Sequence, residues 1–420
     1  MADRLKNLLL AVLLTLMVVL LGATFLLSMR NSQGGQRLLQ ALRPVEKTGA
    51  SQTAITAMAW PEKLAVLGEE GVFYAVSGEE YTQLYQQGEA LCQEALGSAD
   101  APAQLTETEY RRLLQAPAIL AEYHSGLPFY LLQAWSGSEE LRTELTVRSF
   151  ALTKTAFGVV LLLTDEKGSR WQAMTAASAA ELEELCAQER QSNAILAKES
   201  YPGLAWDELL LTGAADLPGY SSLRPDIVEK GELSQQVQAL FSMNAYLARV
   251  YQNSSGSLVY VEGRSTLSLG QEGELIYAGA EGADLEISAG QEPQRTVEIC
   301  QKVCTLMRQV WSETGASGRL SLDSVRQENG RLLLSFALDV GGKFLEKDGG
   351  WAQVTVEDGA VTGASAYLRR LEPEEHALLL PMTEAAGMLA ALPHRQARLC
   401  IRMTAGESGF VPGICRVTED

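Results

Sequence analysis

The sequence predicts an α+β protein that is held at a membrane by a single N-terminal transmembrane helix. Three observations lead to this fold class: an uncharged apolar segment at 8–29, an alternation of helix-type and strand-type segments, and hairpin signals such as Asn329-Gly330 and Asp358-Gly359. Because tight hairpins join antiparallel strands, we expect antiparallel sheets with helices packed on them.

The predicted transmembrane helix covers 8–29, after a short tail at 1–7. It contains no charge, and a helix of about 20 apolar residues spans the hydrocarbon core. No Ala-x-Ala site follows it, so we interpret it as a retained signal anchor rather than a cleaved signal peptide or a buried core helix. Long domains translocate largely regardless of loop charge. We therefore expect a cytoplasmic tail and a large extracytoplasmic body at the cell membrane.

A polar linker is expected at 30–55, followed by an N-terminal α+β domain at 56–222. Thr106 and Glu109 form a capping-box pattern that begins a short helix. The segment 129–135 fits either a strand or a helix. The other predicted elements are strands at 72–76, 119–123, 147–152, 158–164 and 170–174, and helices at 79–96 and 179–197.

The second half predicts a middle helix/hairpin domain at 230–372 and a C-terminal helix/strand unit at 373–420. A helix followed by a hairpin recurs along this half, which indicates duplicated helix-plus-antiparallel-hairpin domains. The helices are expected at 233–251, 296–311 and 383–392. The strands are expected at 257–269, 274–278, 320–326, 331–340, 352–357, 360–368, 398–403 and 411–417.

The formal net charge of −18 argues against nucleic-acid binding, which needs a basic surface to neutralise phosphates. Six cysteines in 420 residues lack the density of a disulfide scaffold. Cys300 and Cys304 share the apolar stripe of a predicted helix, so we expect them in its buried face. Cys400 and Cys415 are equidistant from a turn at 405–409, so a hairpin could align them for a disulfide, although Pro412 interrupts the second arm.

No motif in the sequence indicates catalysis, and we expect no catalytic residue, cofactor or metal site. The three histidines, His124, His376 and His394, lack metal-ligand spacing, and His124 is expected in a turn. The pairs Asp207-Glu208 and Glu374-Glu375 read as solvated surface. A pair of glycosidase carboxylates that lie far apart in the chain remains open.

Small residues mark one face of the predicted transmembrane helix. Ala11 and Thr15 lie one turn apart, and Gly22 lies two turns further along. Small side chains let helices approach closely in lipid. This face is our hypothesis for contact with a partner helix, against the alternative that it faces lipid.

Four patterns follow one another along the chain: a capped helix leading into a strand that ends in tyrosine, a tyrosine-rich hairpin, a helix begun by proline, and a terminal Val-Pro strand. The capped helix and its strand are 105–114 and 119–123, followed by Leu127-Pro128, and the hairpin is Tyr260-Val-Glu-Gly263 with 267–269, Gly273 and Tyr277. The helix begun by proline is Leu379-Leu-Pro381 with Ala385-Ala386, and the terminal strand contains Phe410-Val-Pro412. In this order they resemble the YycH/YycI group, and the domain ahead of the duplicated units favours YycH. Gly413-Ile414-Cys415 replaces the terminal aromatic residue of that group, so we expect a shortened last unit.

The resemblance implies a single-span, extracytoplasmic regulator of a two-component sensor histidine kinase that controls cell-wall metabolism in Gram-positive bacteria. The implied partners are the sensor histidine kinase, a sister YycI-like regulator and the membrane. A surface-anchored module that binds a peptide or a glycan of the cell envelope is the alternative. An apolar pocket with convergent polar groups would favour that alternative, whereas buried carboxylates clustered in a cleft would favour an envelope hydrolase.

Overall fold

The structure, a computed structural model, describes residues 58–138, 140–141, 145–201, 203–225, 227, 233–288, 290–347, 349–389, 397–406 and 409–418. The described residues all belong to one compact unit, Gln52–Asp420. The tail, the predicted transmembrane helix and the linker at 30–55 lie outside them. In the described part of the chain, no helix combines the length and the apolarity that crossing a membrane requires.

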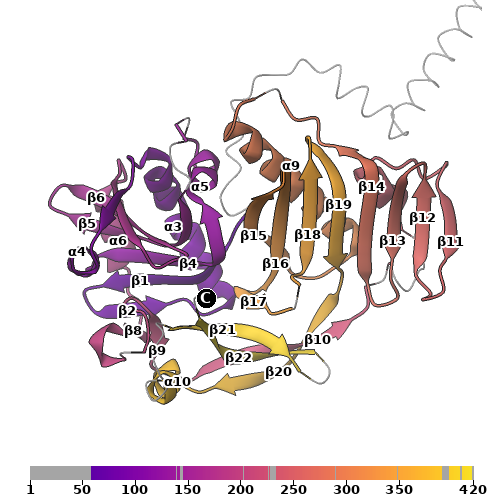
Figure 1. Cartoon of the computed structure of the whole chain (residues 1–420). Coiled ribbons are helices and arrows are strands. Elements are labelled where there is room, and N and C mark those ends of the chain that lie inside the picture. Colours follow the sequence, from indigo (N-terminus) through magenta and orange to yellow (C-terminus); the bar gives the residue numbers. More distant parts are fainter. Residues whose placement is uncertain are drawn as a thin grey trace, which may run out of the picture. The chain divides into compact units, whose positions relative to one another are not determined.

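Nine strands form the first sheet, in the order β3-β7-β6-β5-β4-β1-β2-β8-β9 (Figure 1). Each strand is antiparallel to its neighbours. The strands are β1 (Pro61–Gly68), β2 (Gly71–Tyr74), β3 (Ala103–Leu105), β4 (Ala118–Pro128), β5 (Thr146–Thr155), β6 (Gly158–Asp165), β7 (Arg170–Met174), β8 (Ala194–Leu196) and β9 (Leu209–Leu211).

Both faces of the first sheet are buried. Leu64 and Val66 of β1 join a core with three helices, whereas Ala65 and Leu67 between them join a second core on the opposite face. The three helices are α3 (Gly78–Ser98), α5 (Phe129–Trp135) and α6 (Ala179–Ala187), and the second core contains Tyr110 of α4 (Glu107–Leu113) and residues from the C-terminal hairpin. Since side chains alternate along a strand, apolar residues at every position bury both faces.

Thirteen strands form the second sheet. They run in the order β11-β12-β13-β14-β19-β18-β16-β17-β21-β22-β10-β20, and β15 pairs with β16 beside this path. The strands are β10 (Ala215–Leu223), β11 (Arg249–Gln252), β12 (Leu258–Glu262), β13 (Ser265–Leu269), β14 (Glu274–Asp284), β15 (Arg319–Glu328), β16 (Arg331–Val340), β17 (Lys343–Leu345), β18 (Ala352–Glu357), β19 (Ala360–Tyr367), β20 (Arg370–Leu379), β21 (Ala397–Ala405) and β22 (Gly409–Thr418).

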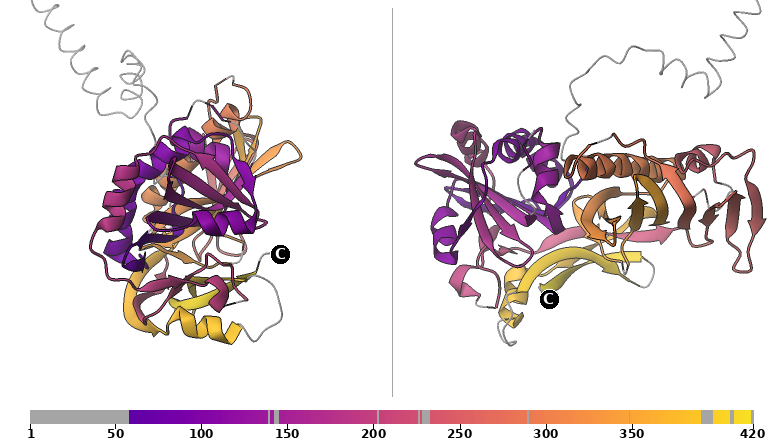
Figure 2. Two further views of the ribbon diagram at one scale, coloured as in Figure 1. Left: turned by 90° about the vertical axis from the view of Figure 1, so that its left-hand side faces the viewer. Right: turned by 45° about the horizontal axis from the view of Figure 1, so that its top comes forward.

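Helix α9 (Gln294–Thr314) lies along one face of this sheet (Figure 2) and packs beside α8 (Gln235–Leu240). Its buried side includes Cys300 and Cys304, as the apolar stripe predicted. Gly315 ends the helix in the left-handed conformation, with φ 68°, which glycine adopts without strain. The α+β class with antiparallel pairing of neighbouring strands is confirmed for most of the molecule, with one parallel contact between β17 and β21.

The C-terminal hairpin, β21 with β22, joins the two sheets. It lies in the second sheet, yet Leu399 and Ile401 of β21 belong to the core on one face of the first sheet. Helix α10 (Met382–Leu389) packs in the same core through Met382 and Ala386. This hairpin therefore places side chains from the end of the chain against β1 and β4.

Several local predictions are confirmed. Thr106 caps α4, and its capping box with Glu109 is complete. Asn329-Gly330 and Asp358-Gly359 form the turns of the β15–β16 and β18–β19 hairpins, with all four residues at positive φ. The open segment 129–135 is the helix α5.

The predicted helices at 179–197 and 233–251 are wrong in their second halves. Helix α6 ends at Ala187, and Ala194–Leu196 instead pairs with β2 and β9. Helix α8 ends at Leu240, because Ser242 takes φ 58° and the chain then turns into β11. In both segments, strand pairing with distant residues outweighs a local helical pattern.

Two further strand predictions change. The single strand expected at 257–269 is the β12–β13 hairpin, which turns at Gly263 with φ 57°. Residues 215–223, at the end of the predicted N-terminal domain at 56–222, form β10 in the second sheet. Strands from the middle and C-terminal units share that sheet, and the division into domains stays a prediction.

Candidate functional site

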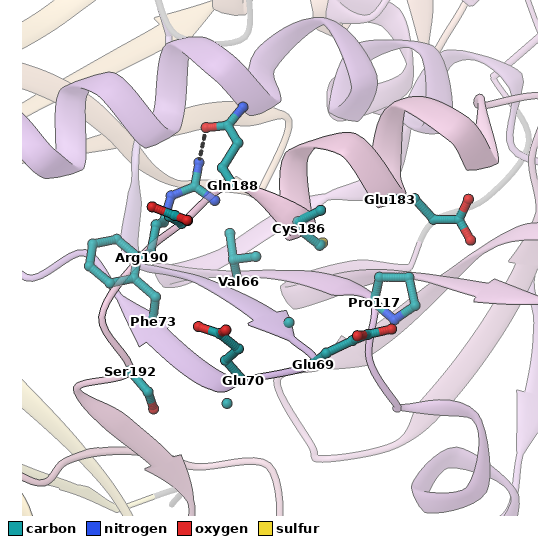
Figure 3. Close-up of a pocket in the computed structure, with 14 residues that line it drawn as sticks. Val66, Glu69, Glu70, Phe73, Pro117, Glu183, Cys186, Gln188, Arg190 and Ser192 are labelled. Atoms are coloured by element: carbon teal, nitrogen blue, oxygen red, sulfur yellow. Dashed lines mark hydrogen bonds between the residues drawn. The ribbon is translucent and has the colours of Figure 1, made fainter.

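A surface cavity of about 330 Å³ lies between the β1–β2 turn and the end of α6 (Figure 3). Gly71 in the turn has φ 129°, a backbone conformation that glycine adopts without strain and other residues rarely take. The lining residues are Val66, Gly68, Glu69, Glu70, Gly71, Phe73, Pro117, Glu183, Cys186, Ala187, Gln188, Glu189, Arg190 and Ser192.

Carboxylates predominate over cations around the cavity. Glu69, Glu70 and Glu189 are exposed, and Glu183 forms an ion pair with Lys154 outside the lining. Arg190 donates to the backbone oxygen of Leu185 at 2.7 Å and stands over the ring of Phe73. Apolar lining residues beside exposed acidic groups suit a ligand that carries a cation or several hydrogen-bond donors.

Cys186 is the only thiol that lines this cavity, and its environment makes it a poor nucleophile. Burial raises the pKa of the Cys186 thiol to about 11, so it is protonated at neutral pH. Its sulfur lies 3.6 Å from the backbone oxygen of Ala118, to which it donates. The cavity therefore has the character of a binding site, not of a thiol-based catalytic site.

A second feature is a buried charge cluster where β21 meets β1 and β4. Lys63 Nζ lies 3.0 Å from Glu122 Oε2 and also contacts Glu208. Arg402 holds both carboxylate oxygens of Glu62, at 2.6 and 3.1 Å. We use the name buried charge cluster for Glu62, Lys63, Glu122, Asp207, Glu208, Arg398 and Arg402, each of which is at most 8% exposed.

Local backbone geometry brings these charges to one face. The register of β1 against β4 shifts between Pro61 and Lys63, a bulge that lets Glu62 and Lys63 both reach β21. Arg398 lies within 4 Å of three carboxylates, those of Glu122, Asp207 and Glu208. Four segments that are distant in sequence, at 62–63, 122, 207–208 and 398–402, thus neutralise one another.

The cations lower the pKa of some carboxyls in the cluster. Burial alone would raise the pKa of Glu62, but Arg402, His124 and Lys63 together outweigh burial and bring the value down to about 2. Lys63, with Arg398, lowers the pKa of Glu122 to about 2 against the effect of burial. Both groups are ionised at any pH near neutrality.

Glu208 behaves in the opposite way. Its burial raises the pKa to about 7, because the attraction of Lys63 is opposed by the nearby carboxylate of Glu122. Glu122 and Glu208 share one lysine, so protonation of the pair is coupled. The cluster therefore contains one carboxyl that exchanges a proton near neutral pH.

The buried carboxylates do not form the cleft of a hydrolase. The void beside Glu122, Asp207 and Arg398 measures about 20 Å³, which is about the space of one water molecule. Each acid is paired with a cation, which is typical of a structural network. Clustered carboxylates are present, as a hydrolase would need, but they have no space for a sugar.

The prediction that Asp207 and Glu208 are solvated surface is wrong. They are 6% and 0% exposed, because Glu208 reaches Lys63 and Asp207 accepts from Arg170 and from the hydroxyl of Tyr110. Apolar residues flank the pair at 204–206 and 209–211, which is the sequence signal for burial. Glu374 and Glu375 are exposed on β20, as predicted.

The predicted cysteine pair is brought together. Cys400 and Cys415 lie directly opposite each other in the β21–β22 hairpin, and both are free thiols in the structure. Pro412 does not interrupt the strand. Gly406 N donates to Gly409 O, and along an antiparallel ladder bonded pairs alternate with non-bonded pairs. Counted from that bonded pair, Pro412 opposite Met403 is in a non-bonded pair, so the ladder needs no N–H from it. The disulfide itself stays a prediction.

The predicted partner-helix residues, Ala11, Thr15 and Gly22, lie outside the described residues. His124 lies in β4, not in a turn, and its Nδ1 is 2.9 Å from Asp323 of β15. A register shift in β4 between Glu122 and Leu127 makes this part of the strand irregular. His394 is outside the described residues, and within them no group of three or more His, Cys, Asp or Glu side chains could hold a metal ion.

Comparison with known proteins identifies a shared fold. No family model and no curated protein matches the sequence. Among solved structures, the crystal structure of YycH from Bacillus subtilis matches with a TM-score of 0.55 at 10% sequence identity. The match covers 85% of this chain and 96% of that chain. The chain is thus similar in fold to YycH over almost the whole length of the chain in that crystal structure.

Proposed function

We propose that this chain is a membrane-anchored, extracytoplasmic regulator of a two-component sensor histidine kinase that controls cell-wall metabolism. The observation that carries the proposal is the likeness in fold to YycH over 96% of that chain. The ordered motifs that resemble the YycH/YycI group and the uncharged segment at 8–29 support it from the sequence. The proposed partners are the kinase and a sister YycI-like regulator.

A regulator of this kind acts by differential binding. If it binds one kinase state more tightly than the other, it shifts the equilibrium between them by that difference, and about 1.4 kcal/mol corresponds to a tenfold shift. The transmembrane helix would contact helices of the kinase, and the outer α+β part would contact its external domain. The proposal assigns no catalytic step to the chain.

The experiment that tests this function separates the body from the span. We would measure the phosphorylated fraction of the cognate response regulator in cells with the full chain, with residues 56–420 deleted, and with residues 8–29 replaced by an unrelated apolar helix. We expect each change to alter the fraction. Unchanged output in both variants would contradict the proposed function.

Photo-crosslinkers placed in the predicted span test the partner-helix face. Positions 11, 15 and 22 share one face of a helix, whereas Leu13 and Leu20 lie on the opposite face. We expect crosslinks to the kinase from Ala11, Thr15 and Gly22, but only to lipid from the two leucines. If all five positions gave lipid adducts alone, we would conclude that the transmembrane helix only anchors the chain and does not contact the kinase.

A specific observation also favours the alternative, a surface-anchored module that binds a peptide or a glycan. The cavity of about 330 Å³ beside α6 combines apolar lining residues with exposed carboxylates. Cationic peptides and soluble cell-wall fragments would be titrated against the full chain and against Glu69→Gln with Glu70→Gln. Loss of binding in the double variant, with kinase output unchanged, would favour the binding module over the regulator.

A further inference from the structure

Two edge strands of the second sheet, β20 and β11, are built differently. At the β20 edge, Pro373 removes one backbone donor, and Glu372, Glu374 and Glu375 surround it with negative charge. Proline and charge on an edge strand prevent another strand from pairing with it. At the opposite edge, β11 has the sequence Arg-Val-Tyr-Gln, without proline or acid. In the part of the chain that the structure describes, no strand lies beyond β11 (Figure 1).

Large apolar side chains are exposed along this second edge. Tyr246 and Leu247, in the turn before β11, are 84% and 67% exposed, and Val250 and Tyr251 within it are 54% and 53% exposed. Single exposed apolar residues are ordinary, but a contiguous group on an edge strand, which is paired on one side only, marks a protein interaction site. We use the name β11 edge for Tyr246, Leu247 and Arg249–Gln252.

Hydrogen bonds hold the β11 edge in place at both ends. Before the strand, the side chain of Asn244 accepts from Tyr246 N, and Asn244 N donates to Glu262 of β12. After the strand, Asn253 Oδ1 accepts from the backbone N–H groups of Ser255 and Ser257. Such a preorganised edge loses little conformational entropy when a partner binds.

The ladder of the β11–β12 hairpin decides which backbone groups face outward. Asn253 N donates to Ser257 O next to the turn, and bonded pairs alternate with non-bonded pairs from there. Tyr251, opposite Val259, is therefore bonded to β12, whereas Val250 and Gln252 direct N–H and C=O away from it. An added strand would pair with Val250 and Gln252.

Charge identifies the chemistry of the partner. The chain has a formal net charge of −18, but the arm at 244–266 carries Arg249 and Arg264 against one acid, Glu262. Both arginines are exposed at the same end of the hairpin, and Arg249 has no ion-pair partner among the described residues. An acidic segment would be attracted here and repelled by most of the remaining surface.

We propose that the β11 edge binds an extended, acidic segment of a partner protein, which adds to the second sheet as a further strand. Main-chain hydrogen bonds to Val250 and Gln252 supply affinity, and the exposed apolar side chains of the edge contact alternate side chains of the segment. Arg249 favours acidic partners. This inference goes beyond the proposed function and does not require that the partner be a kinase.

The test uses the full chain in lipid nanodiscs and two fluorescent peptides. Each peptide alternates threonine with valine, one between glutamate ends and one between lysine ends, and binding is followed by fluorescence anisotropy. We expect the glutamate-ended peptide to bind more tightly, although the net charge of the protein would favour the lysine-ended one. Methylation of alternate backbone nitrogens in the peptide should abolish binding when the methyl groups lie on the edge of the peptide that pairs with β11.

Val250→Pro is the decisive variant, because it removes an outward N–H that the β11–β12 ladder does not use. We expect it to lower affinity about tenfold or more, since an added strand loses hydrogen bonds at this position. Arg249→Glu should reverse the preference between the two peptides without changing the backbone. Leu378→Asp, at an exposed apolar residue of the β20 edge, is the matched control and should leave affinity unchanged.

Circular dichroism of each variant verifies that the fold is retained. Equal affinity of Val250→Pro and the unaltered chain, or preference for the lysine-ended peptide, would overturn the proposal. Sedimentation tests a different occupant. Three results together would mean that the β11 edge pairs with a second copy of the chain instead: the chain dimerises, the dimer dissociates in Val250→Pro, and neither peptide binds. None of these outcomes depends on kinase output, so the proposed function can fail separately.

Discussion

Lys63 illustrates at the scale of single residues how burial changes the role of a charge. It is fully buried, and an isolated ammonium group would be costly there. Glu122 and Glu208 both contact it, and Arg398 in turn contacts both carboxylates. The network as a whole contributes little to the free energy of unfolding, but removal of one member leaves an uncompensated buried charge.

Arg402→Met is predicted to destabilise the protein by roughly 3–5 kcal/mol, because Glu62 would keep a buried charge without its bidentate partner. Chemical denaturation measures the change. Arg331→Met, which breaks the exposed pair with Glu357, is the control, with an expected cost of about 0–1 kcal/mol. A similar loss of unfolding free energy in both variants would argue against a large contribution from the buried Arg402–Glu62 pair. Adding Glu62→Gln to Arg402→Met should recover part of the loss.

Glu208 predicts a dependence of stability on pH. Its pKa is raised from 4.5 to about 7 by burial, so the folded state keeps a proton that the unfolded chain has lost between these values. The contribution of Glu208 to the free energy of unfolding therefore falls as pH rises from 4.5 to 7. Denaturation midpoints across this range should show a flatter profile for Glu208→Gln. An identical profile for the variant would refute this assignment.

Glycine positions decide at the scale of elements how closely the C-terminal hairpin packs. A Cβ atom on Gly409 would lie 1.9 Å from the backbone oxygen of Tyr220 in β10, and backbone cannot yield as a flexible side chain does. We therefore expect Gly409→Ala to lower the unfolding midpoint and displace the hairpin. Gly387→Ala, in α10 with no atom within 4 Å of the added Cβ, should stabilise by up to about 1 kcal/mol. Equal effects of the two variants would contradict this packing.

Element prediction from the sequence succeeded where the signal is local. The capping box of Thr106, the turns at Asn329-Gly330 and Asp358-Gly359, and the stripe of α9 are all contained within a few turns of chain. It failed at 194–196 and at 249–252, where the segments form β8 and β11. Their strand character comes from partners elsewhere in the chain, which a local periodicity does not contain.

The C-terminal hairpin has a role at the scale of the whole molecule that its position in the sequence does not indicate. Residues 397–418 supply Leu399 and Ile401 to the core of the first sheet, and Arg398 and Arg402 to its buried acids. The unit Gln52–Asp420 is one compact body. We therefore expect the two sheets to unfold together rather than in sequence.

Truncation after residue 396 tests this expectation. Removing the hairpin exposes Ala65 and Leu120 of the first sheet, and it takes Arg402 away from Glu62 and Arg398 away from Glu122. The variant should lose the protection of amide hydrogens in β1 and β4 in hydrogen exchange, although both strands remain in the chain. Full protection of the first sheet in the truncated protein would mean that it folds alone.

Residues close together in the chain were enough to predict the α+β class, the hairpin turns, the cap of α4 and the buried face of α9, because each of these depends on local contacts. The sequence also placed Cys400 opposite Cys415, since a turn equidistant from both fixes their register. The fold alone shows which cations neutralise Asp207 and Glu208, and that β1 meets β21. Those contacts join residues up to 340 positions apart, and a buried ion pair leaves no periodic signal in either of the segments that form it.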